Sequence, residues 1–319
     1  LGLETSFTYS SSSNHYLRDK QSGRGWYTTT PTHKVVVDKH CSIDHITQSQ
    51  LCQTYTYHDG CFDDKDRRFL GFGMVEVFDA EQLSQTNTPH DTPPSCVRTW
   101  YHNGTLQARQ ERTQEFYQGD SQHVILERPI LDPNTQLTAP TAEEWDEAQR
   151  MLAGEQMRQE VYALDAQGQM VPHPYTISQS RHHVKRLQAA KNNERACFFV
   201  HVIESLQYDY EQQSSDPRVQ HSMTLVVDEH GIPTRTASIA YPRRSSIPTH
   251  LSAQQDTLVT VQDLQITHID TLQRRLLATP KEQKGFENVE GAKELIRFHL
   301  MNILNQILQE TMRQRLKSL

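Results

Sequence analysis

The sequence predicts a mainly β fold, built as a thin antiparallel sheet. Hydrophobic residues make up 35% of the 319 residues, against the roughly 45–50% of ordinary soluble domains, and the mean hydropathy is −0.73. Short β-branched and aromatic stretches, bounded by Gly, Pro and Asp-Gly turns, recur along the chain. A sheet with one face in water needs fewer apolar residues than a closed core, so the low fraction is typical of such a wall.

The first stretch, residues 1–33, is rich in Ser, Thr and Tyr without a clear period and is interpreted as an irregular N-terminal segment. β signals begin at residue 34 with the run Val35, Val36 and Val37. Tyr55 and Tyr57 share one face of a further strand, which we expect to end at a turn formed by Asp59 and Gly60, because both residues tolerate positive φ.

After the glycine-rich stretch 69–73, residues 74–78 alternate: Val75 and Val77 point one way, and Met74, Glu76 and Phe78 point the other. Residues 84–95 contain three prolines and are predicted to form a loop. Asn103-Gly104 predicts a hairpin between strands at 96–102 and 105–117.

Two helices are expected. Thr141, with Glu144 three residues later, forms a capping box for a short surface helix over about residues 141–153. Apolar residues at helical spacing predict a C-terminal helix over about residues 292–316. Further strands are expected at 159–165, 196–210 and 223–228. The predicted organisation is an irregular segment 1–33, a β-shell segment 34–290 and a helical segment 291–319; the start at a leucine suggests a fragment of a longer chain.

Charge and hydropathy exclude several function classes. The net charge is −7, so we expect no nucleic-acid binding, and the basic clusters at 181–186 and 243–244 are interpreted as solvated faces or as partners for acidic groups on an adjoining chain. No stretch approaches the roughly 18 apolar residues of a membrane helix, so no direct membrane insertion is predicted. No classical signal peptide is visible.

Cysteines and catalytic motifs point away from enzymes. Five cysteines are an odd number in a long chain, which favours reduced thiols; a metal site of Cys41, Cys52 and Cys61 with nearby histidines lacks the paired spacing of zinc ligands. Phosphate-loop, nucleophile-elbow and zinc-protease motifs are missing. We therefore expect no enzyme activity, no cofactor and no metal, and we interpret most of the seventeen histidines as surface residues.

One passage is more specific than any composition argument. The stretch from residue 55 to 79, YTYHDGCFDDKDRRFLGFGMVEVFD, resembles the middle region of the B component of insecticidal toxin complexes and of SpvB-type virulence plasmid proteins. The matching positions are Tyr55, Tyr57, Gly60, Arg67, Phe69, Gly71, Phe72, Gly73 and Val75, interpreted as a structural motif without a ligand. Stretches beginning at residues 160, 204, 216 and 237 are similar to the same family, in the same order.

The resemblance implies a spiralling antiparallel β-sheet strip of an Rhs/YD-repeat shell. In such toxins the B and C components enclose a cytotoxic C-terminal domain, and other parts of the B component dock onto the pore-forming A component. The expected partners are therefore an Rhs-type C component and, indirectly, the A component, in a complex that is secreted after synthesis in the bacterial cytoplasm. Propeller repeats and the Glu-x-Glu pair of SpvB-type ADP-ribosyltransferases are not visible in this sequence.

Two function classes remain open at this point. The leading hypothesis is a structural wall segment that encapsulates and helps deliver a toxic domain. The alternative is a β-sandwich-like module that binds protein or glycan through the loops at 84–95 and 213–218.

Overall fold

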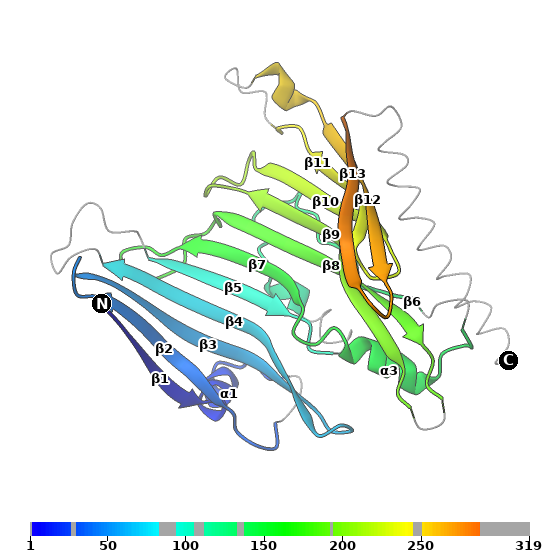
Figure 1. Cartoon of the computed structure of the whole chain (residues 1–319). Coiled ribbons are helices and arrows are strands. Elements are labelled where there is room, and N and C mark those ends of the chain that lie inside the picture. The colour runs from blue at the N-terminus through cyan, green and yellow to red at the C-terminus, as the bar shows by residue number, and fades with distance from the viewer. Residues whose placement is uncertain are drawn as a thin grey trace. The chain divides into compact units, whose positions relative to one another are not determined.

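A computed structural model describes residues 2–26, 30–82, 94–104, 112–132, 137–191, 194–244 and 251–287. The chain divides into two compact units: unit 1 contains residues 1–123, 152–178 and 209–214, and unit 2 contains 124–151, 179–208 and 215–319. The described residues form thirteen strands, two α-helices and two short 3-10 helices (Figure 1). The predicted mainly β class is confirmed. In the described part of the chain, no helix is long and apolar enough to cross a membrane.

In unit 1 each strand pairs antiparallel with the next one along the chain. The strands are β1 (Leu3–Ser11), β2 (Val35–Asp44), β3 (Ser49–Asp63), β4 (Arg68–Gln82), β5 (Ser95–Tyr101) and β7 (Gln156–Ala163). The core of this unit contains Met74, Trp100, Phe116 and Met157. As predicted, β4 alternates: Met74 and Glu76 are buried, whereas Val75 and Val77 are half-exposed.

The expectation of an irregular segment 1–33 is wrong for its first two-thirds. Residues 3–11 form β1, and α1 (Ser12–Gln21) follows directly. Ser11 caps this helix, because its side chain accepts a hydrogen bond from the Ser13 N–H at 3.3 Å. The helix is mostly polar, with Tyr16 and Leu17 as its only large apolar residues, so hydrophobic periodicity does not reveal it.

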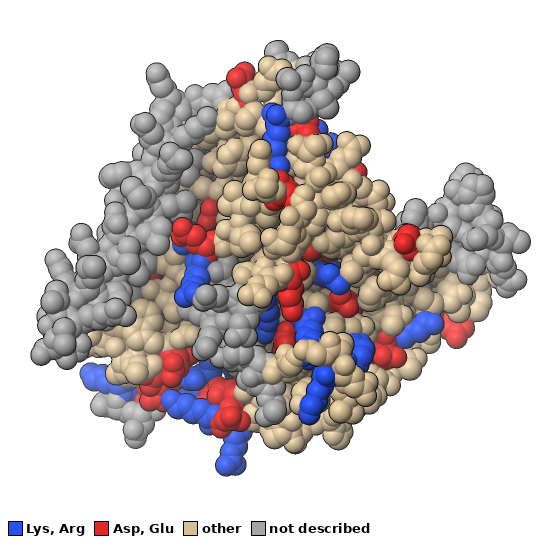
Figure 2. All heavy atoms as spheres, turned by 180° about the vertical axis from the view of Figure 1, so that it is seen from behind, with Lys and Arg blue, Asp and Glu red and all other residues tan. Residues whose placement is uncertain are grey.

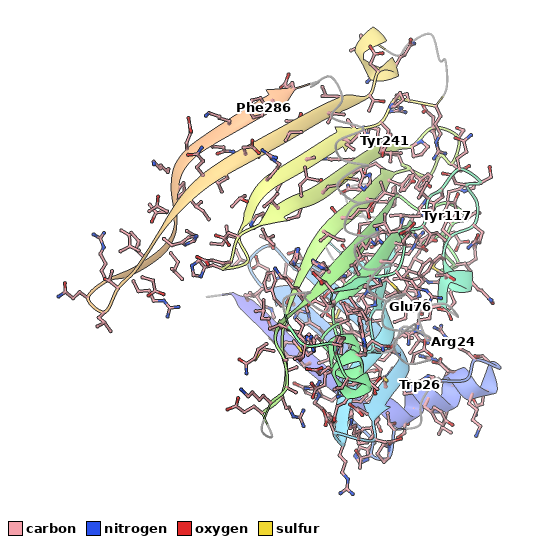
Figure 3. All side chains as sticks on the ribbon, turned by 90° about the vertical axis from the view of Figure 1, so that its right-hand side faces the viewer. Arg24, Trp26, Glu76, Tyr117, Tyr241 and Phe286 are labelled. Atoms are coloured by element: carbon pink, nitrogen blue, oxygen red, sulfur yellow. A yellow bond between two sulfur atoms is a disulfide. The ribbon has the colours of Figure 1, made fainter. Side chains whose placement is uncertain are left out.

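Unit 2 repeats the same kind of topology. Its strands are β8 (Thr176–Gln188), β9 (Cys197–Asp209), β10 (Arg218–Val227), β11 (Pro233–Ala240), β12 (Leu258–Asp270) and β13 (Arg275–Glu287). Most residues of β8 and β9 belong to this unit. They are neighbours in chain order, and the short β6 (Ile130–Asp132) adds to β8 in parallel. Nearly every residue of β13 is exposed, including Phe286 at 41% (Figure 3).

The predicted surface helix is confirmed as α3 (Ala142–Arg150). Its capping box is complete: the Thr141 hydroxyl accepts from the Glu144 N–H at 3.2 Å, and the Glu144 carboxylate accepts from the Thr141 N–H at 2.8 Å. The same carboxylate accepts a hydrogen bond from Arg186 on β8 at 2.8 Å. One glutamate therefore starts the helix and fastens it to the sheet.

Two turn predictions are wrong. Asp59 and Gly60 lie inside β3, which continues to Asp63, and Asp59 takes a positive φ of 54° within the strand. The described residues do not show the hairpin predicted at Asn103-Gly104: β5 pairs with β4 and β7, and residues 113–115 form a 3-10 helix, η1. Residues 105–111 of the predicted second strand lie outside the described residues. Residues 84–93 of the predicted loop and the predicted C-terminal helix at 292–316 lie outside the described residues.

The interpretation of all five cysteines as reduced is also wrong. Cys41 on β2 and Cys52 on β3 face each other across the strand pair and form a disulfide. Cys61 and Cys96 are buried thiols, and Cys197 is an exposed one. Sequence spacing does not show the pairing, because it depends on the register of β2 against β3.

Candidate functional site

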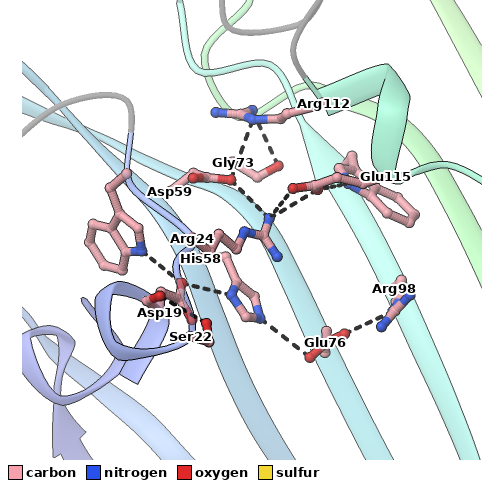
Figure 4. A network of polar contacts seen from close by, with 12 residues as sticks. Asp19, Ser22, Arg24, His58, Asp59, Gly73, Glu76, Arg98, Arg112 and Glu115 are labelled. Atoms are coloured by element: carbon pink, nitrogen blue, oxygen red, sulfur yellow. Dashed lines mark hydrogen bonds and ion pairs between the residues drawn. The ribbon is translucent and has the colours of Figure 1, made fainter. Parts of the chain in front are cut away.

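Among the described residues of unit 1, a largely buried polar network lies where α1 and two loops meet the sheet (Figure 4). We call it the unit 1 network; it consists of Asp19, Arg24, His58, Asp59, Glu76, Arg98, Arg112 and Glu115. Figure 3 shows Arg24 and Trp26 beside α1. The contacts join residues from five separate stretches of chain: α1 with the loop after it, β3, β4, β5 and the loop around η1.

His58 forms the centre of the network. Its Nδ1 lies 2.8 Å from the Asp19 carboxylate of α1, and its Nε2 lies 3.3 Å from the Glu76 carboxylate of β4. The His58 and Asp19 side chains are only 8% and 3% exposed. Burial disfavours the imidazolium, but the hydrogen bonds to Asp19 and Glu76 outweigh it, and the pKa of His58 is raised.

The pKa values of the two acidic partners, Asp19 and Glu76, are lowered. Burial opposes ionisation of Asp19, yet hydrogen bonds from His58 and the Trp26 indole bring the pKa of Asp19 down to about 2. The pKa of Glu76 is also lowered, because its hydrogen bond to His58 and the adjacent Arg98 guanidinium outweigh its burial. The arrangement therefore favours the ionised forms of all three side chains.

Two arginines extend the network to the loops. Arg24 lies 3.1 Å from the Asp59 carboxylate and 2.9 Å from that of Glu115. Arg112, 5% exposed, donates to the backbone carbonyls of Gly73 and Tyr101 at 3.4 and 3.1 Å. Its guanidinium lies 3.5 Å from Asp59, and burial lowers its pKa.

Three glycines of the predicted motif make this packing possible. A Cβ on Gly60 would lie 2.5 Å from the Trp26 ring, and a Cβ on Gly73 would overlap the Arg112 guanidinium. Gly71 has open space around it but a φ of +103°, which L side chains rarely adopt. Gly60 and Gly73 thus leave room for the side chains of Trp26 and Arg112, and Gly71 allows the backbone its positive φ.

The other motif residues pack or turn the chain. Tyr57 and Phe72 lie with ring centroids 4.7 Å apart, and Phe69 lies 5.1 Å from Phe72. Tyr55 stacks on Tyr57 at 6.4 Å. Arg67 sits in the turn before β4 with a φ of 48°. The structure therefore gathers the motif residues into the β3–β4 hairpin, with the aromatic members on its surface toward α1 and Trp26.

A second buried group of unit 1 lies on β7 and on the loop of residues 112–118, which precedes β7 in the chain. Arg158 and Glu160 are both fully buried, and Arg158 Nε donates to Glu160 Oε1 at 2.6 Å. Glu160 also accepts from the Tyr117 N–H at 3.0 Å and from the Tyr162 hydroxyl at 2.6 Å. Burial, then the Glu160 charge, raises the pKa of Tyr162 above its ordinary range. This group fastens the 112–118 loop onto the sheet.

The basic cluster at 181–186 is not a solvated face. In unit 2, Arg181 is 5% exposed and lies 3.3 Å from Glu204, which in turn lies 2.8 Å from His221 Nε2. Arg186 is 1% exposed and pairs with Glu144. The acidic partners thus belong to the same unit of this chain, and Arg243 similarly binds Asp216 at 2.9 Å.

Residue patterns alone did not identify these networks. No sequence motif marks Asp19, His58 or Arg112 as members of a network, and their ionic partners within it lie far away along the chain. The sequence does carry one signal: Glu76 and Glu160 lie in strands close to buried apolar residues. An unpaired carboxylate buried there would cost several kcal/mol in desolvation. Such a position implies a cationic partner, although not which one.

These networks hold helices and loops against the strands of the sheet. Each carboxylate of the unit 1 network lies against a basic side chain, so its charge is neutralised where it sits. Among the described residues, no group of three or more His, Cys, Asp or Glu side chains is arranged to hold a metal ion. Figure 2 shows acidic and basic side chains next to one another over the described part of the face seen there.

Comparisons with known proteins give a consistent result. Residues 1–104 match the family model of the insecticide toxin TcdB middle/N-terminal region, and residues 147–296 match that of the TcdB middle/C-terminal region. The comparison with curated proteins finds no match.

Among solved structures, the crystal structures of TcdB2-TccC3 and of TcdB2-TccC3-Cdc42 are both 27% identical to this chain, with a TM-score of 0.76 over 90% of it. The same values hold for the Photorhabdus luminescens Tc holotoxin pore carrying a TccC3 mutation. The chain spans about 14–15% of the length of these matched chains. The two family models, matched in order over most of the sequence, together with the shared fold, place this chain in the middle region of the TcdB-type insecticidal toxin family.

Proposed function

We propose that this chain is a wall segment of a toxin-complex shell, in which residues 34–290 form part of the sheet that encloses a cytotoxic C-terminal domain and helps to deliver it. The observation that carries this proposal is the shared fold, over 90% of the chain, with chains solved as TcdB2-TccC3 and as a Tc holotoxin pore. The partners would be an Rhs-type C component and, through other parts of the B component, the pore-forming A component.

The segment would act without catalysis, as an extracellular part of the assembled complex. Its contribution is mechanical: the buried networks fasten α1, α3 and the covering loops to a sheet that has few apolar residues. A wall of this kind needs charges that are paired within it, because unpaired buried charges would favour its opening.

A β-sandwich binding module is not favoured. Sandwich folds such as the immunoglobulin fold connect strands of two packed sheets in a Greek key. In each unit the strands lie in one sheet, in the same order as in the chain, apart from the short β6.

The experiment is protection of the toxic domain in an assembled B–C complex. We expect co-expression of a B component carrying this segment with a C component to give a complex in which the toxic domain resists limited proteolysis. Arg112→Ala and Glu160→Ala should weaken that protection, because both side chains are buried fasteners. Glu229→Ala is the matched control, since its side chain is 84% exposed. A toxic domain that is cleaved equally with and without this segment in place would contradict the proposal.

A further inference from the structure

The sheet of unit 2 has two faces of different chemistry. Across β10, β11 and β12, one face carries two transverse rows of small neutral polar residues. The register aligns Ser222 with Ser238 and Thr260 in one row, and Thr224 with Thr236 and Gln262 in the other. Most of these residues are half-exposed, and Gln262 is exposed. We call this the hydroxyl face.

The opposite face of the same strands is apolar and covered. It carries the core cluster of unit 2: Met223, Leu225, Ala237, Ile239, Val259 and Val261. His221 belongs to this face by alternation and binds Glu204, which also binds Arg181. Arg181 Nε donates to the Arg128 carbonyl at 2.9 Å, so the segment that begins at residue 124 lies on this side of the sheet.

The hydroxyl face is hollowed into a shallow groove of about 260 Å³ along β9 to β12. This is below the roughly 300–1,000 Å³ of pockets that bind small molecules. The one charged residue along the groove is Glu204, and its carboxylate is bound to Arg181 and His221. The groove therefore offers neutral hydrogen-bond donors and acceptors, without a charge pattern and without a large apolar patch.

We propose that the hydroxyl face of unit 2 is the surface that meets the enclosed polypeptide, the C-terminal region of the C component. This inference rests on the proposed function and adds to it which face of the sheet, and which side chains, contact the cargo. The occupant is an extended stretch of chain whose backbone groups hydrogen-bond to the Ser, Thr and Gln side chains.

The chemistry of the face matches a cargo of variable sequence. One of the related complexes was solved as TcdB2-TccC3 without a hypervariable C-terminal region. A surface that meets many sequences gains nothing from a fixed charge pattern, because like charges would repel some of them. An apolar surface would retain apolar segments through the hydrophobic effect. The backbone is common to all sequences, and side-chain hydroxyls and amides can donate to it and accept from it.

The test is site-specific photo-crosslinking in the assembled B–C complex. The photoreactive residue p-benzoylphenylalanine replaces Thr236 at the centre of the hydroxyl face, with Ser238 as a second position on the same face. The matched control replaces Val124, whose side chain is 56% exposed on the covering segment. The complexes carry either of two C-terminal regions of unrelated sequence, and crosslinked peptides are identified by mass spectrometry.

We expect crosslinks from Thr236 and Ser238 to both C-terminal regions, and none from Val124. Crosslinks from Val124 alone, or none from either hydroxyl-face position in a complex that still protects the toxic domain from protease, would overturn the inference and leave the wall function intact. A complex that forms but leaves the toxic domain open to protease would instead refute the wall function. Crosslinks to one C-terminal region only would overturn the sequence tolerance on which the choice of face rests.

Discussion

The replacement Glu160→Gln tests whether buried charge pairs hold this sheet together. Glu160 is fully buried and accepts three hydrogen bonds, from Arg158, the Tyr117 N–H and the Tyr162 hydroxyl. Glutamine keeps the shape but removes the charge, and its NH₂ group turns one acceptor position into a donor. Because Arg158 then remains charged and buried, we expect a loss of about 3–5 kcal/mol in the free energy of unfolding.

Equilibrium unfolding in urea, followed by tryptophan fluorescence, measures this loss. The matched control is Asp263→Asn, which removes a two-pronged pair with Arg235 whose side chains are 45% and 29% exposed; exposed pairs contribute about 0–1 kcal/mol. The double variant Arg158→Met/Glu160→Gln should be more stable than Glu160→Gln alone, because the orphaned charge is gone. The reasoning fails if Glu160→Gln changes stability no more than Asp263→Asn does.

The remaining predictions concern backbone, pH and thiols. Gly71→Val should cost about 1–3 kcal/mol in thermal or urea unfolding, because it forces a side chain onto a φ of +103°, whereas Gly285→Val should cost little; equal losses would argue against the backbone as the cause. For His58, a raised pKa stabilises the fold below its ordinary pKa of 6.5 and less as pH rises through the folded value, so His58→Gln should cost more at about pH 5 than at about pH 9; a pH-independent loss would contradict this. Alkylation of the denatured, unreduced chain should modify three thiols and leave Cys41 and Cys52 joined; five modified thiols would show that the pair does not form.

Much of the local structure followed from residue patterns. The alternation around Glu76 gave the faces of β4, and the Thr141–Glu144 capping box gave the start of α3. These signals work because their physical causes lie within a few residues. The misplaced turn at Asp59 has a local explanation too: a residue that tolerates positive φ can occur inside a strand as well as in a turn, and β3 continues through Asp59 in register with β4.

The networks could not be predicted in the same way. Asp19 and His58 are 39 residues apart and Tyr117 and Glu160 are 43 apart, and only the folded sheet brings them together. Net charge and composition favour a basic cluster around Arg181 that is solvated or paired with an adjoining chain, because they carry no information about burial within this chain. A buried arginine and a solvated one look alike in sequence.

The order of the strands has a consequence for how the sheet can form during synthesis. Because most strands pair with the one that precedes them in the chain, most of the loops that must close are short, and contacts that are local in sequence form faster than distant ones. The sheet can therefore form strand by strand as the polypeptide emerges during synthesis, because most new strands pair with the strand before them. The longest insertion, between β5 and β7, carries the loop held by Glu160. Growth there must wait until that loop has been laid down.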